Sequence, residues 1–104
     1  MDDVDSQEFQ ALVQELQLVR TQIQTVSTQV NEISLTLESL STQDANRPVF
    51  RAVGNLLLEV DDREKLVAEL SESKETFENH LMRMVERENE LRTQYEKVVD
   101  SIEK

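Results

Sequence analysis

The chain has 104 residues, with one glycine, one proline, no cysteine and a net charge of −11 at pH 7. Ordinary proteins contain about 7% glycine and about 5% proline, so a turn-rich sandwich or α/β fold is excluded, and the lack of cysteine excludes disulfides and thiolate metal sites. The acidity argues against binding to nucleic acid or to an anionic membrane, and no apolar run approaches the ~18 residues of a membrane span.

The first half of the chain predicts one long helix over residues 6–43. Asp5 or Ser6 is placed to cap its start, and Pro48 forbids helical continuation beyond its end. Apolar residues recur at alternating spacings of three and four, the heptad pattern of a left-handed coiled coil. This seam consists of Phe9, Leu12, Leu16, Val19, Ile23, Val26, Val30, Ile33, Leu37 and Leu40.

The connector predicts a β-hairpin with strands over 49–53 and 56–60. Both runs are rich in β-branched and aliphatic residues, and Gly54-Asn55 between them suits a two-residue type II′ turn. A helical interpretation of 49–60 rests on hydrophobicity alone. Pro48 and the Gly-Asn step favour the hairpin.

The second half predicts a helix over residues 62–103, with Asp61 and Glu64 at capping-box spacing. Its apolar stripe is Leu66, Leu70, Phe77, Leu81, Met84, Leu91, Tyr95, Val98 and Ile102. Ser73 and Glu88 occupy expected seam positions, and the equal steps of four around Phe77 predict a stutter. Two helices of similar length joined by a short segment should fold back antiparallel.

The predicted fold is therefore mainly α: a long antiparallel coiled-coil α-hairpin with a β-hairpin inserted between the helices, in one domain over residues 1–104. One hairpin face should hold Phe50, Ala52 and Leu57, and the other Val49, Val53, Leu56, Leu58 and Val60. The hairpin either folds onto residues such as Leu40 and Leu66, or adds its strands to a sheet supplied by other subunits. The second alternative is favoured, because the coiled coil has little apolar surface to spare.

Candidate sites are few. His80 lies among glutamates, but one histidine without cysteine or a second histidine is a weak metal or general-base signal, and an exposed helix residue is the simpler interpretation. We expect no catalytic residue, metal or cofactor.

Apolar side chains at the distal helix ends form a candidate binding surface for apolar segments of another protein. They are Phe9, Leu12 and Val13 opposite Val98, Val99 and Ile102.

The order helix, β-hairpin, helix resembles a β-class prefoldin subunit, and the resemblance is carried by Arg47 to Val60, RPVFRAVGNLLLEV. It is similar to the family pattern of an aromatic, a basic and a small residue, then Val-Gly and a run of aliphatics. The Gln-, Thr- and Ser-rich first helix departs from the family, and the particular subunit is left open. A eukaryotic β-type subunit is the expectation.

The resemblance implies an ATP-independent, cytoplasmic co-chaperone without a cofactor. Two α-class and four β-class subunits would form a β-barrel body whose coiled-coil tips hold unfolded clients, such as actin and tubulin, for the cytosolic chaperonin. It further implies that the strands complete that inter-subunit barrel, with assembly residues Val49, Phe50, Val53, Gly54, Leu56, Leu57, Leu58 and Val60. Two alternatives stay open: a structural or tethering coiled coil that pairs with a partner helix, and a monomeric bundle of the tubulin-binding cofactor A type.

Overall fold

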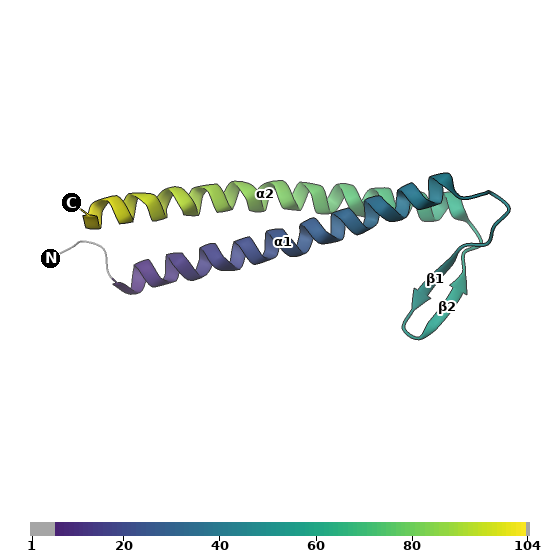
Figure 1. Ribbon diagram of the computed structural model, residues 1–104, viewed down its shortest axis with the longest axis horizontal. Coiled ribbons are helices and arrows are strands. Elements are labelled where there is room, and N and C mark those ends of the chain that lie inside the picture. Colours follow the sequence, from purple (N-terminus) through teal and green to yellow (C-terminus); the bar gives the residue numbers. More distant parts are fainter. Residues whose placement is uncertain (1–5, 104) are drawn as a thin grey trace.

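The computed structural model describes residues 6–103 and consists of two long helices with a β-hairpin between them (Figure 1). Helix α1 is Ser6–Thr42, strands β1 and β2 are Phe50–Val53 and Leu56–Glu59, and helix α2 is Arg63–Glu103. The molecule measures 72 × 25 × 16 Å. The predicted mainly α, antiparallel helical hairpin with an inserted β-hairpin is confirmed, whereas the inter-subunit barrel stays a prediction. Within the described residues, neither helix is long and apolar enough to span a membrane.

The two helices pack along the seam that the heptad pattern predicts. Every predicted seam residue of α1 is buried or half-buried. The best-packed region is the distal half, where Leu16 and Val19 of α1 enclose Leu91 of α2, which is 1% exposed. Leu12, Ile23 and Tyr95 pack around this cluster. The arm is therefore held together mainly by aliphatic burial away from the hairpin.

The seam of α2 differs from the prediction around Ser73 and at its end, where Ile102 is exposed. Ser73 is exposed and Lys74 is half-buried, so the residues facing α1 are Leu70, Lys74, Phe77 and Leu81. Their spacings of four, three and four show no stutter around Phe77, where it was predicted, and the two consecutive steps of four fall instead between Leu66, Leu70 and Lys74. Lysine is tolerated here because its aliphatic stem can cover apolar surface while the ammonium reaches water.

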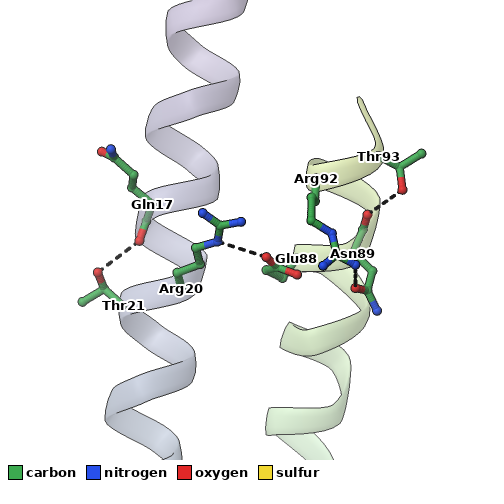
Figure 2. Close-up of polar contacts among 7 residues, drawn as sticks. All are labelled: Gln17, Arg20, Thr21, Glu88, Asn89, Arg92 and Thr93. Carbon is green, nitrogen blue, oxygen red and sulfur yellow. Dashed lines mark hydrogen bonds and ion pairs between the residues drawn. The ribbon is translucent and has the colours of Figure 1, made fainter. Parts of the chain in front are cut away.

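Glu88 occupies the seam position where an apolar residue was expected, and an ion pair accounts for it. Arg20 Nε of α1 donates to Glu88 Oε2 at 3.0 Å, and the Glu88 side chain is only 15% exposed (Figure 2). On the opposite side of the seam, Arg87 donates to Glu15 and to Glu90. The hydrogen bond and charge of Glu15 raise the pKa of Arg87 above its ordinary value. The Arg20–Glu88 and Glu15–Arg87 pairs cross-link the helices where the core is tightest.

The connector is fixed by hydrogen bonds at both ends. Asn46 N–H donates to Asp44 Oδ1 at 2.9 Å and fixes the turn that follows α1. The guanidinium of Arg63 donates to the Arg47 carbonyl at 2.7 Å. The cap of α2 is Asp62, whose Oδ1 accepts from Lys65 N–H at 3.0 Å. The predicted cap, Asp61, is thus one residue early. Of the two residues predicted to cap α1, Ser6 is the first residue of the helix and Asp5 lies outside the described residues.

The hairpin is antiparallel and pairs Phe50 with Glu59 and Val53 with Leu56. Val60 N–H donates to the Val49 carbonyl at 2.7 Å, so pairing continues one residue beyond the strands. Gly54 has a φ of +59°, and it is the only positive-φ residue in the described chain. A positive φ at the first turn residue alone is the pattern of a type II′ turn.

We expect Leu91→Ala to lower the free energy of unfolding by about 3 kcal/mol, because it removes a fully buried side chain from the tightest part of the seam. Urea unfolding followed by circular dichroism measures this change. The matched control is Leu35→Ala, at a leucine that is 55% exposed, which should change stability by less than about 0.5 kcal/mol. Equal losses would show that the seam is not the principal source of stability.

Candidate functional site

The β-hairpin exposes apolar side chains on both faces. All eight strand residues are exposed, with Phe50 at 54% and Leu57 at 71%. The register places Phe50, Ala52 and Leu57 on one face, as predicted, together with Glu59. The other face holds Val49, Arg51, Val53, Leu56, Leu58 and Val60. Exposed leucines on both sides of a two-stranded sheet are typical of a surface that is covered in an assembly.

Neither strand packs on a helix. The elements in contact are α1 with α2 and β1 with β2, and the hairpin projects away from the arm (Figure 1). Leu40 is buried in the seam, and Leu66 is half-buried and lines an open groove together with Arg51 and Leu58 of the strands. The hairpin is not buried against these two residues, because all eight strand residues stay exposed.

Both edges of the hairpin are open. The Val60–Val49 hydrogen bond identifies this couple as a hydrogen-bonded pair, and such pairs alternate along an antiparallel ladder. Phe50 and Ala52 of β1 therefore direct their backbone N–H and C=O groups outward, and so do Leu57 and Glu59 of β2. Each edge thus offers a template for one further strand.

The distal end of the arm contains a second apolar surface. Phe9 of α1 stacks on Tyr95 of α2, with ring centroids 5.7 Å apart and planes inclined at 26°. Beside this pair lies an open groove of about 380 Å³, lined by Glu8, Phe9, Leu12, Gln94, Lys97 and Val98. The floor is apolar, and Glu8 and Lys97 place one charge of each sign at its rim.

The six residues predicted for the tip divide between several places. Phe9, Leu12 and Val98 line this groove. Val13 lies in another groove, on the other side of the seam, Val99 is half-buried and Ile102 is 53% exposed in the last turn of α2. The sequence placed Tyr95 in the seam but missed its stacking on Phe9. That contact depends on the register between the helices, which no local pattern reports.

His80 is exposed on α2 and lies beside a shallow groove with Gln22 and Met84. Within residues 6–103, no group of three histidine, cysteine or acidic side chains is arranged to hold a metal ion. His80 therefore belongs to no metal-binding group in this part of the chain.

Comparison with known proteins bears directly on this arrangement. The family model described as prefoldin subunit matches residues 5–104. The chain belongs to the prefoldin beta subunit family. The crystal structure of the prefoldin beta subunit from Thermococcus strain KS-1 superposes with a TM-score of 0.78 at 27% identity, covering 98% of this chain and 94% of that one. The beta2 subunit from the same strain, at 20% identity and a TM-score of 0.76, shares the fold.

The sequence of this chain is similar to that of prefoldin beta subunits from other organisms. That of Thermoplasma acidophilum is 34% identical over 67 residues, 64% of this chain and 54% of that protein. That of Archaeoglobus fulgidus is 37% identical over 59 residues, 57% of this chain and 50% of that protein. The matches to this chain thus span about half the length of these relatives. The expected eukaryotic origin stays a prediction.

Proposed function

We propose that this chain is a β-class subunit of a hetero-hexameric, ATP-independent co-chaperone that holds unfolded polypeptides. The observation that carries the proposal is the β-hairpin, whose two apolar faces and two open edges have no partner within the described chain. Membership of the prefoldin family, whose members are chaperone subunits and not enzymes, supports the same role. A tethering coiled coil has no need of such a hairpin.

Assembly would proceed by strand addition. Strands from neighbouring subunits would pair with the outward groups of Phe50 and Ala52 on one edge and of Leu57 and Glu59 on the other. Closing the strands into a barrel removes both edges and covers one face of every hairpin. In this proposal, the residues that drive assembly are those predicted from the sequence, with Gly54 holding the turn at a φ that other residues adopt at a cost of about 1 kcal/mol or more.

The tips would hold the client. The groove beside Phe9 and Tyr95 is shallow and open, so a single arm should bind an apolar segment only weakly. Several arms on one body act together, because each contact raises the effective concentration for the next. Weak individual contacts also permit release without nucleotide hydrolysis. Delivery of actin- or tubulin-like clients to the cytosolic chaperonin is part of this proposal.

The direct test is reconstitution. The purified chain is mixed with an α-class prefoldin subunit and analysed by native mass spectrometry, then added to a chemically denatured protein whose aggregation is followed by light scattering. We expect a complex of two α-class and four copies of this chain that suppresses aggregation without ATP. A chain that stays monomeric, or a hexamer that leaves aggregation unchanged, contradicts the proposal. A monomer that pairs with an added helix instead supports the tethering alternative.

A further inference from the structure

The two sides of the coiled coil differ in chemistry. On α2, residues at spacings of three and four run along one side of the seam: Met82, Val85, Asn89, Arg92, Glu96 and Val99. The facing stripe on α1 contains Val13, Gln17 and Arg20, and the two stripes share a groove of about 340 Å³. We call this side the arginine flank. On the opposite side, the middle of the arm carries the Glu15–Arg87 ion pair and Gln22 beside His80, and the tip groove lies at its end.

Apolar residues on the arginine flank alternate with charge at heptad spacing. Arg20 and Arg92 line the middle of the flank. Seven residues toward the tip, their equivalents are Val13 and Val99, and seven residues toward the hairpin, the equivalent of Arg92 is Val85. Val85 is 43% exposed and its neighbour Met82 is 63% exposed. Each heptad advances about 10 Å along a helix, so the order apolar, cationic, apolar extends over about 20 Å.

Arg92 has no acidic partner. Its guanidinium donates to Asn89 Oδ1 at 2.6 Å, along its own helix, and no carboxylate lies within 4.0 Å of it in the described chain (Figure 2). Arg20 contacts Glu88 through Nε, and its side chain is still 53% exposed. Arg92 is thus the guanidinium of this groove that lacks a carboxylate partner in the described chain, whereas Arg20 is paired with Glu88.

We propose that the arginine flank is a docking surface for an amphipathic helix of another protein. On that helix, an acidic residue would lie between two apolar residues, one heptad away from each. Apolar residues beside the seam widen a two-helix interface into one that accepts a third helix. The acidic residue of that helix would pair with Arg92, since an exposed guanidinium without a carboxylate is free to form a bidentate contact. Glu96 lies one turn nearer the tip than Arg92, so the docking helix would carry a neutral or basic residue at the position that faces Glu96. This surface is distinct from the tip groove and from the hairpin, and the proposal does not depend on the client-holding role.

The probe is a designed 22-residue helical peptide with leucine, glutamate and leucine at heptad spacing on one face. A second peptide of otherwise identical sequence carries lysine in place of the glutamate. The full-length chain is labelled with ¹³C at the methionine methyl groups. We expect the glutamate peptide to shift the Met82 methyl signal and to leave that of Met84, which is 7% exposed in the seam, unchanged. Fluorescence anisotropy should give the glutamate peptide at least tenfold higher affinity than the lysine peptide.

Variants decide whether the contacts are those proposed. Arg92→Glu should reverse the preference between the two peptides, and Val85→Lys should weaken binding of the glutamate peptide at least tenfold. Gln22→Lys, on the opposite side of the same arm, is the matched control and should change neither affinity. All three positions are exposed, so circular dichroism should report unchanged helix content. Equal affinity for both peptides, or a preference that survives Arg92→Glu, overturns the proposal.

Discussion

Replacing Leu57 and Leu58 together with serine should abolish hexamer formation with an α-class subunit and leave the arm folded. The two side chains lie on opposite faces of the hairpin and are 71% and 47% exposed in the single chain. Burying a leucine contributes about 1.5–3 kcal/mol, so two lost leucines weaken each contact between subunits by roughly 10²- to 10⁴-fold. Size-exclusion chromatography with light scattering measures the assembly, and circular dichroism measures the arm.

The matched control is the double substitution Leu18→Ser and Leu35→Ser. These leucines are 58% and 55% exposed, but they belong to α1, which has no contact with either strand. The control removes a similar amount of exposed apolar surface to the Leu57/Leu58 variant. It also lowers helix propensity slightly, because both of its serines lie in a helix. It should assemble normally. If both variants assemble equally well, the hairpin does not hold the subunits together. If the Leu57/Leu58 variant also loses helix, then the strands support the arm, contrary to their lack of contact with it.

Features with a period or a unique residue could be predicted from the sequence. The seam of α1 repeats without interruption from Phe9 to Leu40, and this regularity fixes both the helix and its buried face. Gly54 is the only glycine, and among residues 6–103 it lies at the one place where the backbone has a positive φ. Pro48 separates the helical pattern from the strands. Such signals are local, so neither tertiary contacts nor partners are needed to interpret them.

Features that depend on a choice between similar neighbours, or on the register of two helices, could not be predicted. Ser73 and Lys74 are both polar, and only packing shows that the lysine stem enters the seam. Asp61 and Asp62 are equally good caps by type, and the chain uses the second. The Phe9–Tyr95 stack and the pairing of Arg20 with Glu88 follow from the alignment of α1 against α2. A sequence pattern on one helix carries no information about that alignment.

The tip groove lies far from the hairpin, so substitutions in the groove should weaken client binding without loss of assembly. Helix α1 has 37 residues, so about 55 Å separates its two ends. Replacing both Phe9 and Val98 with serine removes the aromatic stack and two apolar groups that line the tip groove. We expect the hexamer to form normally and its suppression of client aggregation to fall at least tenfold, because a loss on each arm is multiplied over the arms that hold one client.

The competing explanation is that the substitutions merely loosen the arm. Val30→Ser tests it, because Val30 is a half-buried seam residue that lies far from the tip groove. It should lower the unfolding temperature by an amount comparable to that of the tip variant and leave suppression of aggregation intact. Light scattering of a denatured client, at equal hexamer concentration, compares the two variants. Equal loss of suppression in both would assign the effect to arm stability, and full suppression by the tip variant would place client binding elsewhere on the molecule.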